Sequence, residues 1–223
     1  MRWAEGFIAV DWGTTNRRGY LIAADGRLLD EMEDDQGILS VPPGGFPEAV
    51  AQLRSRLGDR PMLMAGMVGS NRGWVEASYV PCPAGLREIA DSLRWAEPGW
   101  IAIIPGVSYA SGPAADVMRG EEVQILGAVA QAMVGADALV CHPGTHNKWV
   151  RLEERRITSF RTVMTGELFS LMKEHSILSE LLSGPVDTGE AFAAALEMAG
   201  REPREIDGEE AFLAGARQLA ELI

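Results

Sequence analysis

A short apolar strand pattern that ends in a Gly-Thr turn occurs twice in this chain, once near the amino terminus and once beyond the middle. The first runs from Phe7 to Val10 and leads through Asp11 into Gly13-Thr14-Thr15. The second runs from Leu139 to Cys141 and leads into Gly144-Thr145. Two further short strand patterns and then helical patterns follow each turn. We therefore expect two α/β halves with the same opening architecture.

Hydrophobic periodicity and turn residues predict the remaining elements. The predicted strands cover residues 7–10, 18–24, 27–33, 62–65, 101–104, 139–141, 148–152 and 156–160. The predicted helices cover residues 45–57, 119–133, 167–173, 190–198 and 209–222. Between the strands at 62–65 and 101–104 lies a long insert rich in Gly, Pro and aromatic residues, of the kind that usually carries specificity. The boundary between the two domains is placed near Gly135, which gives the regions 1–135 and 136–223.

Charge and cysteine content limit the classes of partner. The chain has 223 residues, and its 20 Lys and Arg against 32 Asp and Glu give a net charge of −12, which argues against nucleic acid or an anionic membrane as the main partner. Cys82 and Cys141 form neither a metal-binding spacing nor a disulfide framework. No segment has the roughly 18 continuous apolar residues of a membrane span, and the start lacks the apolar core of a signal peptide. We expect a cytoplasmic protein.

The first Gly-Thr turn has the composition of a phosphate-binding hairpin. A carboxylate at the end of a buried strand can hold a hydrated Mg²⁺, the glycine lets backbone N–H groups approach phosphate oxygens, and threonine hydroxyls add donors. Asp11, Gly13, Thr14 and Thr15 are therefore candidate nucleotide-phosphate ligands, with Asp11 also serving the metal, through water. The alternative is an ordinary hairpin with Gly13 at its turn.

Six motifs in order carry a resemblance to a known family. They are DWGTTN at 11–16, GMVGSNRGW at 66–74, YVPCPA at 79–84, DVMRGEE at 116–122, PGTHNKW at 143–149 and MTGELF at 164–169. Through most of residues 7–178 the chain resembles the 2-dehydro-3-deoxygalactonokinases. The resemblance implies the α/β fold of the actin and sugar-kinase superfamily, with two ribonuclease-H-like lobes around a cleft. It also implies ATP-dependent phosphorylation of the C6 hydroxyl of the sugar acid 2-dehydro-3-deoxy-D-galactonate, in galactonate catabolism, with ATP and Mg²⁺ as cofactors.

The resemblance implies roles for the second turn and for a catalytic acid. The opposing phosphate turn would consist of Gly144, Thr145, His146 and Lys148, although His146 also suits a structural hydrogen bond and Lys148 an exposed strand position. Glu121 is the first choice for the general base, because Gly120-Glu121 is similar to the Gly-Asp turn that carries the catalytic acid in related carbohydrate kinases. A carboxylate there also suits the positive end of a helix. Asp116 is the alternative base, and its structural alternative is a cap or loop hydrogen bond.

The glycine-punctuated loop after the strand at 62–65 is the expected substrate site. Its candidate sugar-acid ligands are Ser70, Asn71, Arg72, Trp74 and Tyr79. Arg72 has the geometry for a bidentate pair with the substrate carboxylate. The alternatives are a solvated surface arginine for Arg72 and core packing for Tyr79. The segment 165–167 is expected to close the cleft from the second half, and the alternative is that Gly166 forms a turn before the helix at 167–173.

After Phe160 the sequence shows only helical patterns, whereas a second lobe needs further strands to complete its sheet. We therefore expect a second lobe that is incomplete within 136–223, with exposed apolar surface and a possible homo-oligomer. Two alternative functions remain open. One is an inactive sugar-acid-binding remnant of such a kinase, and the other is a phosphatase-like hydrolase of polyphosphate or nucleotide.

Overall fold

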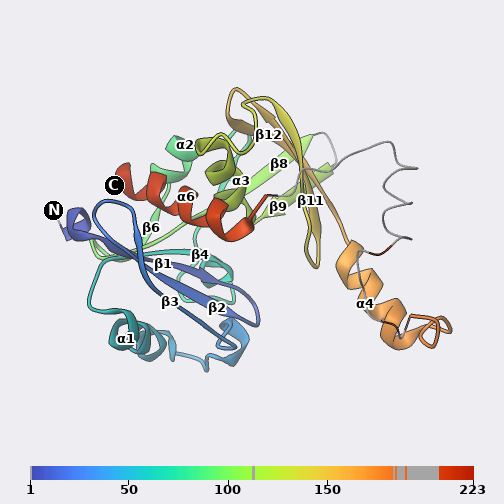
Figure 1. Cartoon of the computed structure of the whole chain (residues 1–223), viewed down its shortest axis with the longest axis horizontal. Coiled ribbons are helices and arrows are strands. Elements are labelled where there is room, and N and C mark those ends of the chain that lie inside the picture. The colour runs from blue at the N-terminus through green and yellow to red at the C-terminus, as the bar shows by residue number, and fades with distance from the viewer. Residues whose placement is uncertain (1, 112–113, 183, 185–188, 190–205) are drawn as a thin grey trace.

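A six-stranded mixed sheet forms the centre of the molecule in the computed structural model, which describes residues 2–111, 114–182, 184, 189 and 206–223 (Figure 1). Its strands, from edge to edge, are β3 (Leu28–Asp34), β2 (Arg17–Ile22), β1 (Phe7–Trp12), β4 (Met62–Gly66), β7 (Ile101–Ile103) and β6 (Arg94–Glu97). Strands β1, β4 and β7 are parallel, whereas β2, β3 and β6 pair antiparallel with their neighbours. The meander predicted for the amino terminus is confirmed.

Helices cover both faces of this sheet. Successive strand residues point to opposite sides, so Phe7 and Ala9 belong to one buried cluster and Ile8 and Val10 to another. The cluster around Ile8 packs against α1 (Phe46–Leu57), which has the predicted proline in its first turn. The opposite cluster packs against α3 (Glu121–Ala130) and α6 (Gly208–Glu221). Figure 1 shows α1 below the sheet and α3 and α6 above it.

Two three-stranded sheets adjoin this core. The predicted second meander is present as β10 (Ala138–His142), β11 (Asn147–Glu153) and β12 (Arg156–Val163). The other sheet consists of β5 (Tyr79–Pro81), β8 (Gly106–Ser111) and β9 (Ala114–Met118). Periodicity did not predict this sheet, nor β6 and the short helix α2 (Leu86–Ala90). These elements are short and mostly only partly buried, so they lack the alternating apolar pattern on which the prediction depends.

The remaining helices differ from prediction in three respects. Helix α3 ends at Ala130 and not at Met133, and its cap is Gln131. The predicted helix 190–198 lies outside the described residues. Helix α4 (Thr165–His175) is longer than predicted and has no buried residue. Three 3₁₀ turns complete the elements, at η1 (Arg2–Glu5), η2 (Ile38–Ser40) and η3 (Met67–Gly69).

Helix α6 packs on α3, although sequence analysis assigned its residues to the second lobe. The two helices approach closely at Gly127 and Gly215, where an added Cβ would overlap the backbone oxygens of Ala211 and Val123 respectively. Phe212 also lies 5.8 Å from the Tyr20 ring, measured between centroids. The last described helix therefore contributes to the core on the face of the central sheet opposite α1.

Helix α4 projects away from the rest of the molecule (Figure 1). The expected apolar surface is present here, because Leu168, Phe169 and Leu171 are exposed, as are Ile177 and Leu181 after the helix. Self-association through this surface stays a prediction. Among the described helices, none combines the length and apolar character that crossing a membrane requires.

Candidate active site

The carboxyl ends of two neighbouring parallel strands position the first candidate residue. Asp11 lies near the end of β1, and the adjacent strand β4 ends at Gly66, which pairs with Trp12 in the sheet register. Ligands of open α/β sheets usually bind outside the carboxyl ends of the strands. The partly buried Asp11 carboxylate therefore lies at the edge of the sheet where a ligand is expected.

Two glycines with positive φ bring α3 to this edge. Gly66 has φ 90°, and a Cβ there would come within 2.7 Å of the Trp12 carbonyl oxygen and 3.3 Å of Asp11 Oδ1. Gly120, directly before α3, has φ 107°, and its Cβ would come within 3.3 Å of Gly66 Cα. Because both positions lack a side chain, the amino end of α3 approaches the end of β4, and Glu121 begins the helix there.

Asp11 and Glu121 are close enough to interact electrostatically. Burial raises the pKa of Asp11 above its ordinary value, the Arg18 guanidinium opposes this shift, and Glu121 adds to it. Within the described part of the chain, no N–H or O–H group donates to the Asp11 carboxylate. A partly buried carboxylate without a donor, beside a second carboxylate, fits a hydrated divalent cation. No cluster of three or more metal-ligating side chains occurs among the described residues, so waters and phosphate oxygens would complete the coordination, as Mg²⁺ prefers.

Glu122, which sequence analysis did not select, is fully buried behind Glu121. Both of its carboxylate oxygens accept from the Gly120 N–H, at 2.9 and 2.8 Å. Glu121 Oε2 accepts from the Arg119 N–H at 2.9 Å. Burial, followed by the neighbouring Glu121 charge, raises the pKa of Glu122 to about 8. The two glutamates therefore fix the backbone of the turn that precedes α3, while Glu122 itself stays away from solvent.

The first Gly-Thr turn rests on the segment around η2. The carbonyl oxygens of Gly13, Thr14 and Thr15 accept from the N–H groups of Ile38, Leu39 and Gly37, in that order, at 2.9–3.2 Å. Thr14 and Thr15 are exposed. Among the described residues, their backbone N–H groups have no protein acceptor. The turn therefore has its carbonyls held on one side and its donors available to a ligand.

The second Gly-Thr turn is in contact with the start of α4. The Thr145 carbonyl accepts from the Glu167 N–H at 3.0 Å, and an added Cβ at Gly166 would overlap the Gly144 backbone. His146 Nε2 lies 2.5 Å from Glu167 Oε2. The structure therefore places residues 165–167 at this turn, and it gives His146 a carboxylate partner. Among the described residues, no hydrogen bond joins the first turn to the second.

Lys148 and Asp116 belong to one hydrogen-bond network with Thr162 of β12, a residue that sequence analysis missed. Lys148 is buried, so its alternative as an exposed strand residue was wrong. Its Nζ donates to the Val117 carbonyl at 2.8 Å and to Thr162 Oγ1 at 2.7 Å. Thr162 donates from Oγ1 and from its N–H to the two oxygens of Asp116, at 2.7 and 2.6 Å. Asp116 thus makes the structural hydrogen bonds that were its alternative role, and its catalytic role stays a prediction.

The expected substrate loop follows β4 and η3. Ser70 is buried and accepts from the Arg72 N–H at 3.2 Å, while Asn71 and Arg72 are exposed. Trp74 stacks on Phe46, with ring centroids 6.5 Å apart. The Tyr79 ring, 41% exposed, lies over the guanidinium of Arg119, which is 4.4 Å from the ring centroid. Arg119 therefore connects this loop with the turn that carries Glu121.

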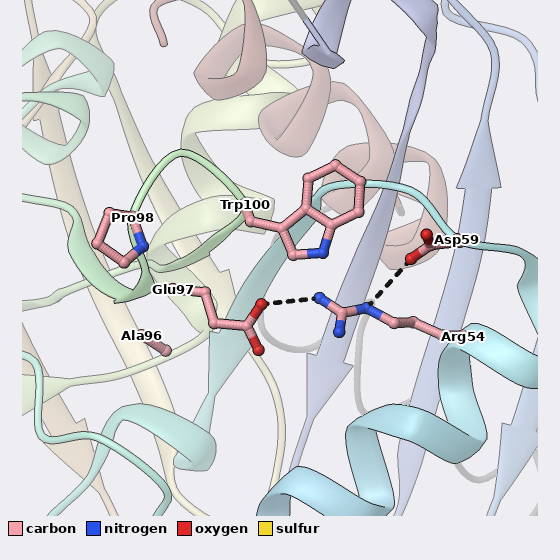
Figure 2. A pocket seen from close by; sticks show the side chains of 6 residues that line it. All are labelled: Arg54, Asp59, Ala96, Glu97, Pro98 and Trp100. Atoms are coloured by element: carbon pink, nitrogen blue, oxygen red, sulfur yellow. Dashed lines mark hydrogen bonds and ion pairs between the residues drawn. The ribbon is translucent and has the colours of Figure 1, made fainter.

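One pocket lies away from these residues. It has a volume of about 530 Å³ and is lined by Arg54, Asp59, Ala96, Glu97, Pro98 and Trp100. Figure 2 shows Arg54 between the two carboxylates, with its guanidinium facing the Trp100 ring. The pocket lies at the amino ends of β4 and β7, whereas Asp11 and Gly66 lie at the carboxyl ends of their strands. It therefore belongs to a different edge of the sheet.

Comparison with known proteins identifies the family. The sequence profile of the 2-keto-3-deoxy-galactonokinase family matches residues 11–222. The chain belongs to this family. It is 40% identical over 205 residues to a protein of Rhizobium meliloti (strain 1021) named as a probable 2-dehydro-3-deoxygalactonokinase, covering 89% of this chain and 66% of that protein. It is also 40% identical over 194 residues to the 2-dehydro-3-deoxygalactonokinase of Escherichia coli (strain K12), covering 86% of this chain and 64% of that protein.

A solved structure supports the galactonokinase fold. The crystal structure of a protein from Sinorhizobium meliloti, named as a putative 2-dehydro-3-deoxygalactonokinase, matches with a TM-score of 0.75 and 34% identity over 97% of this chain and 80% of that chain. The predicted resemblance to this family and the expected actin-like α/β fold class are confirmed. The chain spans slightly less than two thirds of the length of the two curated galactonokinase relatives.

Proposed function

We propose that this chain phosphorylates the C6 hydroxyl of 2-dehydro-3-deoxy-D-galactonate with ATP. Two relatives that are named as a probable 2-dehydro-3-deoxygalactonokinase and as a 2-dehydro-3-deoxygalactonokinase support this proposal. The observation that carries the proposal is the convergence of Asp11 and Glu121 at the carboxyl ends of β1 and β4. Phosphoryl transfer requires neutralised phosphate charge and an aligned acceptor hydroxyl whose proton is removed. Two carboxylates with separate tasks at one edge of the sheet suit both requirements.

Each residue in this proposal has a defined task. Glu121 accepts the proton of the acceptor hydroxyl, and the hydrogen bond from the Arg119 N–H orients its carboxylate. The exposed Gly13-Thr14-Thr15 turn binds phosphate oxygens through its N–H groups and hydroxyls, and the turn at Gly144-Thr145 binds them from the other side. Asp11 would hold Mg²⁺, which neutralises charge on the nucleotide phosphates when bound. The Ser70–Trp74 loop binds the sugar acid.

An acceptor-dependent assay tests the proposal. The 223-residue chain is incubated with Mg²⁺, ATP and 2-dehydro-3-deoxy-D-galactonate, and ADP is measured beside a sample without the acid. We expect ADP formation that depends on the acid. Phosphate release at equal rates with and without the acid would instead indicate a hydrolase. Binding of the acid without ADP formation would indicate a sugar-acid-binding remnant.

A second experiment tests the assigned base. Glu121→Gln keeps the shape of the side chain but removes its basicity, so we expect turnover to fall by about 100-fold or more. Glu153→Gln at the exposed end of β11 is the matched control and should leave turnover unchanged. Unchanged turnover in folded Glu121→Gln would refute the assignment of Glu121 while leaving the kinase activity itself intact.

A further inference from the structure

Arg119 is a partly buried cation that forms no salt bridge with a described residue. It interacts electrostatically with the Glu122 carboxyl, where it opposes the rise in pKa. Its Nη2 donates to the Ala77 carbonyl at 2.7 Å. Its Nε and Nη1 atoms are also buried, and they make no hydrogen bond with any described residue. The neighbouring carboxylates are engaged by backbone N–H groups, Glu121 by Arg119 and Glu122 by Gly120. Buried donor groups of a charged side chain are strongly disfavoured unless they are paired, so Nε and Nη1 are two donors suited to an anion.

The position of Arg119 indicates where that anion binds. The guanidinium lies against the expected substrate loop, because a Cβ on Gly69 would come within 2.9 Å of Nη1. Tyr79 and Ala77 of the same segment contact it from the side. On its backbone side, Arg119 bonds to the carboxylate of Glu121. The unpaired charge therefore lies between the sugar-acid loop and the proposed base.

Arg72 is less suited to the role that sequence analysis gave it. It is exposed at the tip of the loop, where water screens its charge and an ion pair contributes little. The charge of Arg119 is shielded from water, and electrostatic interactions are stronger in such a low-dielectric environment. Charge recognition is therefore more effective at Arg119 than at Arg72.

We propose that Arg119 supplies the positive charge that recognises the carboxylate of the acceptor sugar acid. This inference rests on the proposed function and specifies which residue selects an anionic acceptor. The Tyr79 ring covers one face of the guanidinium, and its side chain makes no hydrogen bond to a described residue. On binding, this exposed ring moves aside, and the cation–π contact is replaced by an ion pair with the carboxylate.

Binding of two ligands by four variants, which include Arg72→Met, tests the inference. Calorimetry measures the affinity for 2-dehydro-3-deoxy-D-galactonate and for its uncharged C1 carboxamide. Arg119→Met keeps the length of the side chain and removes the charge, so we expect acid binding to weaken at least 10-fold and carboxamide binding to change less than 2-fold. Arg119→Lys, which keeps a charge, should retain most of the preference for the acid. Arg151→Met, on the exposed side of β11, controls for the loss of one positive charge and should bind both ligands as the unmodified chain does.

The outcomes separate this inference from the proposed function. If Arg119→Met weakens the binding of both ligands equally, the role of Arg119 is structural and the inference is wrong. The same conclusion follows if Arg72→Met, and not Arg119→Met, abolishes the preference for the acid. If the unmodified chain binds the acid but forms no ADP, the inference is still decided by these affinities. If the unmodified folded chain binds neither ligand, both the proposed function and the inference fail.

Discussion

Gly120 lies directly against Gly66, and this contact joins the helix that carries Glu121 to the strand beside Asp11. A Cβ on Gly120 would come within 3.3 Å of Gly66 Cα, and both residues have positive φ, 107° and 90°. Neither the close approach nor the backbone conformation suits a residue with a side chain. The distance between the proposed base and the proposed metal ligand is therefore set by two glycines.

Gly120→Ala should lower the rate of ADP formation by more than its loss of unfolding free energy alone would explain. The alanine requires a strained backbone, which costs about 1 to 2 kcal/mol, and its Cβ pushes Glu121 away from Asp11. Gly99→Ala is the matched control, because Gly99 also has positive φ, 70°, but no atom lies within 4 Å of the added Cβ. Urea unfolding should show similar losses for both variants, whereas ADP formation should fall only in Gly120→Ala. Equal activity of the two variants would contradict this account of the Gly66 contact.

Glu122→Gln should stabilise the protein increasingly as pH rises. The pKa of Glu122 is raised from its ordinary value of 4.5 to about 8, so between these values the carboxyl is protonated when folded and ionised when unfolded. Unfolding then releases a proton, and the free energy of unfolding falls with rising pH by at most about 1.4 kcal/mol per pH unit. Glutamine cannot ionise and removes this loss.

Urea unfolding at pH 5, 6, 7 and 8 measures this effect of Glu122. The difference in unfolding free energy between Glu122→Gln and the unmodified chain should grow across the series. The exposed Glu153→Gln serves as the control and should give a constant difference. A constant difference for Glu122→Gln as well would mean that Glu122 is ionised in the folded protein.

Thr162→Val should destabilise the junction between β9 and the second meander. The substitution keeps the side-chain shape but removes the hydroxyl that donates to Asp116 and accepts from Lys148. Leaving these charged groups short of partners costs about 2 to 3 kcal/mol. Thr158→Val on the same strand removes only a 3.3 Å bond to the Arg151 carbonyl and should cost less than about 1 kcal/mol. Chemical denaturation of both variants provides the comparison, and equal losses would show that the network contributes little.

Gly127→Ala should weaken the packing of α6 on α3. In an isolated helix alanine is favoured over glycine by about 1 kcal/mol. Here the new Cβ would overlap the Ala211 carbonyl, and overpacking of this kind costs about 1 to 3 kcal/mol or more. Gly135→Ala, whose Cβ makes only an ordinary contact at 3.5 Å, is the control. A thermal unfolding temperature for Gly127→Ala at or above that of the unmodified chain would show that α6 is not held against α3.

Sequence patterns alone were sufficient to predict the two meanders, helix α1 and the family. Strands such as Phe7–Trp12 have local signals, namely an apolar run and a turn residue, that need no knowledge of distant contacts. The Asp11 and Glu121 candidates followed from motifs for the same reason. The interaction between Asp11 and Glu121 could not be predicted from the sequence. It depends on Gly66 and Gly120, which are 54 positions apart in the sequence and are in contact only in the folded chain.

The burial and the partners of the charged residues are evident only from the tertiary structure. Arg72 and Arg119 are both arginines in glycine-containing motifs, yet Arg72 is exposed, whereas Arg119 is partly buried and has two buried nitrogens without a hydrogen-bond partner among the described residues. Lys148 lies on the same face of β11 as the buried Val150 and Leu152. Its hydrogen-bond partners, Val117 and Thr162, come from two other strands. Burial and charge pairing arise from the packing of separate elements, whereas periodicity reports only neighbours along the chain. For this reason the sequence motifs indicate the candidate site, whereas the burial and pairing of its charged residues depend on the three-dimensional packing.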